Sequence, residues 1–274
     1  MAKLHMLKSL TDTINTSFIL ESGETLLVLD GGFASEAPGM YDYLKSLGGH
    51  VTGWFLTHLH DDHVGCFMTT LREHPDITVD AVYYNFPSDA FAVAAEPNQG
   101  GTTMQEMLDT MRSAIADRHV QNVTVQTGEV YTFDGGEVTV RILRTPDESI
   151  TKDPINNSSS VYRFEVNGKS LLFLGDLGVE GGLQLLGTTD LSLLRTDYLQ
   201  MAHHGQNGVS REVYEAIRPR FCLWCAPSWL WDNYGPGGKD TGPYNTVVTR
   251  GWISAMHCVE HHYLLTEAPH VIEL

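Results

Sequence analysis

The chain has 274 residues, of which 42% are apolar and 19% are charged, and this composition is typical of a globular protein rather than a disordered one. Its 34 acidic and 17 basic residues give a formal charge of −17, which argues against binding to nucleic acid or to an anionic membrane surface. Because an α/β protein of this length commonly folds as one unit, we expect a single domain over residues 1–274.

The N-terminal segment and the cysteines both indicate a cytoplasmic protein. Residues 1–8 lack the apolar run of a signal peptide, and no stretch of the chain reaches about 18 apolar residues. The four cysteines are therefore expected to be reduced thiols. Cys222 and Cys225 have CxxC spacing, but a strand over this run would turn their sulfurs to opposite faces. We interpret both as core residues, with a redox or metal role as the alternative.

The first half of the chain is predicted to mix strands with helices. Apolar or β-branched runs at 14–20 and 25–29 flank the short polar segment 21–24, which is the pattern of a hairpin. A helix over 37–47 is expected to stop at Gly48 and Gly49, and a buried strand over 51–56 follows. Further along, residues 79–84 predict a strand, and residues 104–115 have apolar side chains at helical spacing.

The second half of the chain is also predicted to mix strands with helices. Strands are predicted at 138–143, 160–166, 169–174, 198–201 and 221–225, and helices at 179–186 and 211–217. Asn167-Gly168 between two of these strands is a strong hairpin signal. Two comparable halves of this kind predict an α/β (α+β) fold in which two mixed sheets are covered by helices.

The segment 57–65, which reads THLHDDHVG, directly follows the strand predicted at 51–56. His58 and His60 are two positions apart in an extended segment, so both imidazoles can point to the same side. Asp62 and His63 fall where a new helix is expected to begin, and they can face a second metal. Imidazole and carboxylate ligands together suit Zn²⁺ best, with Mn or Fe as alternatives. The cluster therefore predicts a metal centre.

This segment matches THxHxDHxG, and the chain thereby resembles the metallo-β-lactamase superfamily. The resemblance implies a four-layer αββα sandwich of two mixed sheets and a dinuclear metal site. It extends to the strand that ends at Gly175-Asp176, where the superfamily has a carboxylate that bridges two metals. It also extends to His203-His204-Gly205, where we expect His204 to bind metal and His203 to face the substrate or support the ligands.

Asn156-Asn157-Ser158-Ser159-Ser160, followed by the Gly-Asp strand and the His-His-Gly motif, is most similar to the hydrolase domain of the ComEC/Rec2 DNA-uptake proteins. Many superfamily members have a histidine ligand where this chain has Asn156. An amide oxygen is a weaker ligand for Zn²⁺ than imidazole, so the first metal is expected to bind more loosely, and Mn²⁺ becomes more credible there.

The resemblance implies that two divalent metal ions activate a water molecule for hydrolysis. His58, His60 and Asn156 would hold one metal, Asp62, His63 and His204 the other, and Asp176 would bridge them. Asp62 would also orient the attacking water and accept its proton.

The substrate is expected to be a small phosphodiester or phosphate ester, since the acidic surface disfavours DNA. The irregular segment 228–244 carries Trp229, Trp231 and Tyr234, which either line a substrate pocket or cap the edge of the core. The cation–π capacity of these rings also suits a choline-like headgroup.

Three alternatives remain open at this stage. One is acyl hydrolysis of a lactone, thioester or β-lactam at the same metal pair. Another is a non-catalytic protein with a single structural metal, and the third is a mononuclear iron dioxygenase. The oligomeric state has no signature in the sequence.

Overall fold

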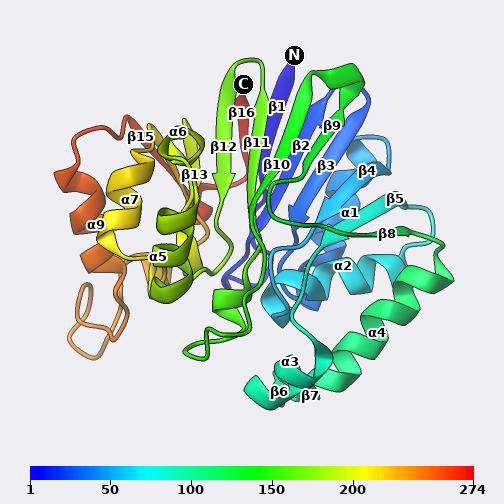
Figure 1. The fold of residues 1–274 in the computed structure, drawn as a ribbon, viewed down its shortest axis with the longest axis horizontal. Coiled ribbons are helices and arrows are strands. Elements are labelled where there is room, and N and C mark those ends of the chain that lie inside the picture. The colour runs from blue at the N-terminus through cyan, green and yellow to red at the C-terminus, as the bar shows by residue number, and fades with distance from the viewer.

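The computed structural model describes residues 1–274 and contains two seven-stranded mixed sheets packed face to face (Figure 1). The first sheet has the order β16-β1-β2-β3-β4-β5-β8, and the second has the order β15-β14-β13-β12-β11-β10-β9. In each sheet one part is antiparallel and the other part is parallel. The two halves of the chain therefore build similar sheets, as their similar sequence patterns predicted.

The strands of the first sheet are β1 (Ala2–Met6), β2 (Ser17–Ser22), β3 (Thr25–Asp30), β4 (His50–Phe55), β5 (Thr78–Tyr84), β8 (Gln121–Thr124) and β16 (His270–Glu273). Those of the second are β9 (Val130–Phe133), β10 (Val138–Arg144), β11 (Val161–Val166), β12 (Lys169–Phe173), β13 (Tyr198–Gln200), β14 (Phe221–Trp224) and β15 (His261–Leu264). A separate short hairpin joins β6 (Asn98–Gln99) to β7 (Thr102–Thr103).

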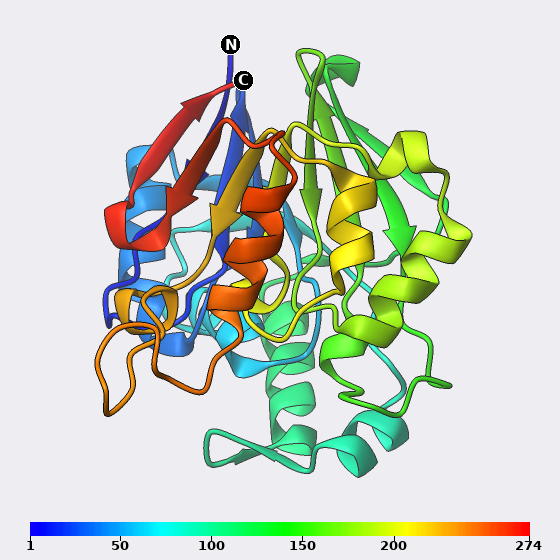
Figure 2. The same ribbon diagram turned by 90° about the vertical axis from the view of Figure 1, so that its left-hand side faces the viewer.

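The helices form the two outer layers (Figures 1 and 2). The α-helices are α1 (Ala37–Ser46), α2 (Asp61–Glu73), α3 (Asp89–Ala95), α4 (Met104–Asp117), α5 (Val179–Thr188), α6 (Leu191–Leu194), α7 (Arg211–Ile217), α8 (Ser228–Trp231) and α9 (Thr246–Ala255). Short 3-10 turns occur at η1 (Ala34–Glu36), η2 (Asp134–Gly136), η3 (Asn156–Ser158), η4 (Ala202–Gly205) and η5 (Leu265–Glu267). The expected four-layer αββα sandwich is confirmed. None of these helices is both long enough and apolar enough to span a membrane.

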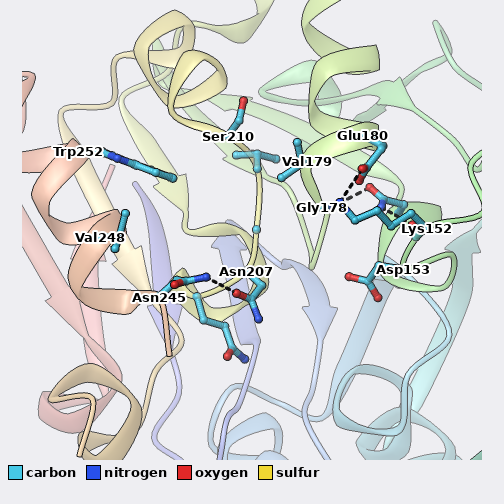
Figure 3. A pocket seen from close by; sticks show the side chains of 14 residues that line it. Lys152, Asp153, Gly178, Val179, Glu180, Asn207, Ser210, Asn245, Val248 and Trp252 are labelled. Carbon is cyan, nitrogen blue, oxygen red and sulfur yellow. Dashed lines mark hydrogen bonds and ion pairs between the residues drawn. The ribbon is translucent and has the colours of Figure 1, made fainter. Parts of the chain in front are cut away.

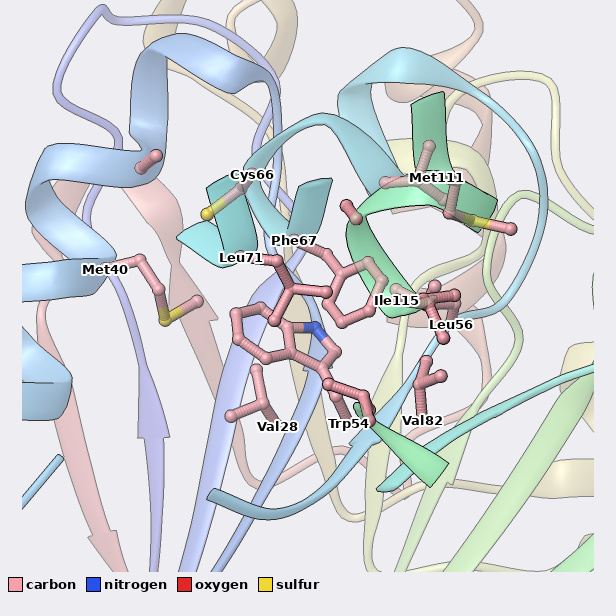
Figure 4. Close-up of a cluster of buried hydrophobic side chains, with 14 of the residues drawn as sticks. Val28, Met40, Trp54, Leu56, Cys66, Phe67, Leu71, Val82, Met111 and Ile115 are labelled. Carbon is pink, nitrogen blue, oxygen red and sulfur yellow. The ribbon is translucent and has the colours of Figure 1, made fainter. Parts of the chain in front are cut away.

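Three apolar clusters hold the layers together. One lies between the outer face of the first sheet and α1, α2 and α4, and it centres on Trp54 and Phe67, whose ring centroids are 5.1 Å apart (Figure 4). A second cluster fills the space between the sheets, and Phe55 packs there against Tyr162 and Phe164. The third lies under the helices that cover the second sheet.

The predicted elements occur close to their expected positions, with a few differences in extent. The first predicted strand begins at Ser17 rather than residue 14, and α5 continues to Thr188. Several elements were not predicted, including the edge strand β16 and its neighbour β1, which are four and five residues long and come from opposite ends of the chain. Cys222 and Cys225 belong to clusters on opposite sides of the second sheet, and all four cysteines are free thiols.

Candidate metal centre

The predicted ligands lie at the carboxyl ends of strands from both sheets. His58 and His60 follow β4, and α2 begins at Asp61, so Asp62 and His63 occupy the first helical turn. Asp176 follows β12, and His204 lies in η4, just after β13. Because the sheets face each other, these ends of the two halves meet.

Four of these side chains converge in one buried cluster. The Nε2 atom of His204 lies 3.1 Å from Oδ2 of Asp62 and 3.2 Å from Oδ2 of Asp176. The Nε2 atom of His63 lies 3.2 Å from Oδ1 of Asp176. One donor atom from each residue falls within 4.8 Å of all the others, so this set could hold a single metal ion.

His58 and His60 form a second group beside this cluster. The Nε2 atom of His58 lies 3.0 Å from Nδ1 of His60, and the rings of His58 and His63 are 4.1 Å apart between centroids. The other ring nitrogen of His60 pairs with the carboxylate of Glu96 at 2.9 Å. Glu96 directly follows α3 and was not predicted from the sequence to take part in the site.

Asn156 is buried and presents an unused oxygen. Its Nδ2 atom donates a hydrogen bond to Asp153 over 3.0 Å, whereas Oδ1 is buried without a hydrogen-bond partner. An orphaned buried carbonyl oxygen costs free energy unless another group completes it. Asn156 therefore keeps a buried oxygen that could bind an ion, and its role as a ligand stays a prediction.

The segment after Asn156 positions the strand end that carries Asp176. Asn157 accepts hydrogen bonds from the backbone N–H groups of Gly178 and Gly181, and the Ser159 hydroxyl accepts one from the N–H of Asp176. Gly175 has a φ of +57°, and a Cβ atom there would lie 2.8 Å from Cβ of Thr57. Only glycine fits between the two motifs.

Asp30 was missed by the sequence analysis, although it is fully buried at the end of β3. Its Oδ1 atom accepts a hydrogen bond from the N–H of Thr57 over 2.8 Å. Its Oδ2 atom accepts from the Thr57 hydroxyl at 2.7 Å and pairs with Nδ1 of His63 at 2.8 Å. The available signal was an acidic residue at the end of an apolar strand, in the run Asp30-Gly31-Gly32.

The two neighbouring histidines of η4 have different environments. His204 is fully buried, and its Nδ1 atom pairs with the carbonyl of Cys225 at 3.1 Å, which leaves Nε2 directed at the two carboxylates. The His203 side chain is 17% exposed, and its Nε2 atom lies 3.8 Å from Asp176. Both residues have positive φ angles, which change the direction in which their side chains leave the backbone.

Residues 10–220 match the metallo-beta-lactamase superfamily, which is more than half of the chain. The chain belongs to this superfamily. A comparison with curated protein sequences gave no match.

Solved structures with the superfamily fold resemble the chain at low sequence identity. Igni18, a metallo hydrolase from the archaeon Ignicoccus hospitalis, is 12% identical with a TM-score of 0.59, and each chain is covered over 100% of its length. CmlA, a diiron β-hydroxylase from Streptomyces venezuelae, is 14% identical with a TM-score of 0.60 over 100% of this chain and 54% of its own. A diphosphatase of the PhnP family is 11% identical, with a TM-score of 0.51 and coverage of 100% and 98%. These likenesses establish the fold.

The superfamily typically binds divalent metals, and the buried donor atoms fit such ions. Nε2 of His63 and Oδ1 of Asp176 lie 3.2 Å apart without the geometry of a hydrogen bond, and the amide oxygen of Asn156 is buried without a partner. Two adjacent buried carboxylates, Asp62 and Asp176, also need compensating positive charge. Divalent ions would supply both the missing partners and the charge.

The pKa values of the cluster respond to this crowding of charge. Burial would lower the pKa of His204, but the charge of Asp176 and hydrogen bonds to both carboxylates outweigh it and raise that pKa to about 9. Burial would lower the pKa of His63 as well, but the nearby carboxylates, with Asp176 the strongest, raise it well above its usual value. In contrast, burial lowers the pKa of His58 well below its usual value, and the nearby His63 lowers it further. His58 is therefore neutral and ready to bind a metal.

The aromatic residues of segment 228–244 lie apart from this cluster. The Trp231 ring packs edge-on against Trp224 with centroids 4.9 Å apart, and the Arg250 guanidinium lies 4.8 Å from its centroid. Trp229 donates a hydrogen bond to the carbonyl of Asp12 over 3.1 Å, and Tyr234 is 54% exposed. Trp231 therefore caps the outer core, whereas a substrate-binding role for Trp229 and Tyr234 stays a prediction.

Proposed function

We propose that the protein is a hydrolase that uses two divalent metal ions to cleave a small phosphate ester or phosphodiester. The observation that carries this proposal is the buried cluster of four potential ligands, Asp62, His63, Asp176 and His204, next to His58 and His60. Donor atoms without partners in a dry site favour metal ions over a purely structural network.

The residues of the chain divide the work between binding and proton transfer. His58, His60 and Asn156 would hold the first metal, and Asp62, His63 and His204 the second, with Asp176 between them. When bound, the metals would lower the pKa of a water molecule and polarise the bond to be cleaved. Asp62 would orient this water and accept its proton, because its carboxylate lies at the centre of the cluster.

His203 would contact the substrate from the edge of the cluster. It is the only one of the two η4 histidines with solvent-exposed surface, and its Nε2 atom faces the Asp176 carboxylate. An imidazole in this position can donate a hydrogen bond to the leaving-group oxygen.

Phosphate-ester chemistry is favoured over acyl chemistry by two observations. The run of residues 156–160 resembles the ComEC/Rec2 type of hydrolase, and one structural neighbour is described as a diphosphatase. The formal charge of −17 argues against a nucleic-acid substrate and in favour of a small one. The likeness to a diiron β-hydroxylase keeps iron-dependent oxygen chemistry as the second candidate.

The test combines metal analysis with a substrate screen on the Asp176→Ala variant. The wild-type protein should contain close to two metal ions per chain and hydrolyse a phosphodiester or phosphomonoester faster than a lactone or thioester. The variant should lose metal and activity together, whereas Asp42→Ala, which alters an exposed aspartate of α1, should lose neither. Full metal retention by Asp176→Ala would contradict the proposal, and oxygen-reactive iron in place of hydrolytic activity would favour the second candidate.

A further inference from the structure

A cavity of about 450 Å³ is lined by residues of α5, segment 206–210 and α9 (Figure 3). On one side Val248 and Trp252 project from α9, and on the other side Val179 and Glu180 stand at the start of α5. The segment 206–210 joins the two sides. We call this cavity the amide pocket, because Gln206, Asn207 and Asn245 line it. Its volume falls in the range of sites for small organic ligands.

The amide pocket is tied to the metal centre by three short stretches of chain. Gly178, which lines it, is two residues from Asp176, and Gln206 is two residues from His204. Asp153 also lines it and accepts the hydrogen bond from Asn156. A molecule whose reactive end lies at the metals can therefore place its other end in this pocket.

Apolar surface stands on both sides of the pocket without covering groups. Val179 is 38% exposed and Val248 is 46% exposed, although both line a concave surface. Trp252 adds a large ring on the α9 side, as Figure 3 shows. Aliphatic side chains opposite an indole form the walls that a flat ring prefers, because stacking buries both of its faces.

Two exposed amides of the pocket lining form a hydrogen-bonded pair. The Nδ2 atom of Asn245 donates a hydrogen bond to Oδ1 of Asn207 over 2.6 Å. This bond leaves an acceptor oxygen on Asn245 and donor hydrogens on Asn207. A donor next to an acceptor complements the edge of a heterocycle that carries the same two groups, which is how amides read nucleobase edges.

The charges around the pocket favour an uncharged ring. The Lys152 ammonium is paired with Glu180 at 2.9 Å. Asp153 is the remaining charged residue of the lining, and it accepts a hydrogen bond from Asn156. The two carboxylates and one ammonium give the lining a net negative charge, which disfavours a second phosphate or a carboxylate.

We propose that the amide pocket binds a planar, uncharged heterocycle with adjacent donor and acceptor groups, the chemistry of a nucleobase. The heterocycle lies between Trp252 and Val179, with its edge on Asn207 and Asn245. This inference deepens the proposed function, because it makes the substrate a phosphate ester of nucleotide type. It rests on that function only for the position of the phosphate.

The test measures the binding of nucleosides, which carry no phosphate and so do not depend on the metals for recognition. Uridine and adenosine are titrated into the full-length, metal-loaded protein by calorimetry, with ribose and phosphocholine as comparison ligands. At least one nucleoside should bind more tightly than both comparison ligands. Trp252→Ala should weaken that binding about tenfold, as expected for the loss of one stacked ring, and Asn207→Ala should weaken it as well.

A matched control alters the same residue type as Asn207 outside the pocket. Asn122→Ala, which changes an exposed asparagine of β8, should leave nucleoside binding unchanged. Circular dichroism of each variant checks that the fold is intact.

Each outcome decides the proposal. Equal binding of ribose and nucleoside would overturn it, and so would unchanged nucleoside binding by a folded Trp252→Ala variant. The proposal would also be overturned if the protein bound phosphocholine instead of a nucleoside and Trp229→Ala abolished that binding. Nucleoside binding that depends on Trp252 in a protein that hydrolyses no phosphate ester would support the pocket and reject the proposed function. Hydrolysis of phosphate esters without nucleoside binding would support the proposed function and reject the proposed role of the pocket.

Discussion

Nδ1 of His63 pairs with Oδ2 of Asp30 at 2.8 Å, and both side chains are fully buried. A carboxylate in this position holds the proton on Nδ1 and leaves the Nε2 lone pair free for a metal. The same carboxylate fixes Thr57, the first residue of the histidine segment. Asp30 thereby sets both the tautomer of one ligand and the position of the segment that carries it.

Asp30→Asn should therefore weaken metal binding although Asp30 touches no metal. If the amide oxygen keeps its bond to Thr57, the amide N–H₂ faces His63 and favours the other tautomer, in which Nε2 carries the proton. We expect a loss of roughly 10- to 100-fold in metal affinity, typical for partners of ligating histidines. Competition with a chromophoric chelator measures this loss.

The surface supplies a matched control for this change. Asp80 pairs with His50 at 2.9 Å, and both side chains are more than half exposed. Asp80→Asn makes the same chemical change in a solvated pair and should leave metal affinity as it is. Equal affinities for Asp30→Asn and Asp80→Asn would show that Asp30 does not act through His63.

Glu96→Ala should lower affinity at the first metal position more than at the second. Glu96 pairs with Nε2 of His60, so its charge strengthens the ligand at Nδ1. We expect about a tenfold loss in the weaker of two binding steps, measured by calorimetry. Asp89→Asn, at the other end of α3, is the control. A loss confined to the tighter step would contradict the assignment of His60.

Asn156→His should tighten zinc at the first position. The buried Oδ1 atom of Asn156 has no partner, and an imidazole is a stronger ligand for Zn²⁺ than an amide oxygen. Selectivity should shift from Mn²⁺ towards Zn²⁺, which metal competition followed by elemental analysis detects. Unchanged zinc affinity would show that residue 156 lies away from the metal.

The thiols should be distinguishable by alkylation at pH 8. Burial raises the pKa of Cys66 to about 12, and it raises those of Cys222 and Cys225 still further. These three thiols stay protonated at pH 8 and thus unreactive, while Cys258 is partly exposed. Mass spectrometry after iodoacetamide treatment should find one modified residue in the folded protein and four after unfolding. Modification of Cys66 at the rate of Cys258 would contradict its burial.

The strand and helix pattern, together with the family resemblance, was sufficient for the sandwich. The histidine segment could be singled out because a dense local motif is a short-range signal, and the role of its residues as ligands stays a prediction. Asp30 and Glu96 were beyond the reach of the sequence. Each meets its histidine only through tertiary packing, across 33 and 36 positions in the chain. The amide pocket was hidden for the same reason, since Asn207 and Asn245 meet only after η4 and α9 have packed together.

The Tyr162 hydroxyl donates a hydrogen bond to the carbonyl of Leu56 over 2.7 Å, and the N–H of Ser160 donates one to Thr57 over 2.8 Å. Both bonds join residues around the start of β11 in the second sheet to the residues just after β4 in the first. Each sheet carries part of the predicted ligand set. The distance between two bound metal ions would therefore depend on the relative position of the two sheets, which these hydrogen bonds hold. If heat or pressure breaks these two hydrogen bonds, the activity should therefore be lost before the chain unfolds.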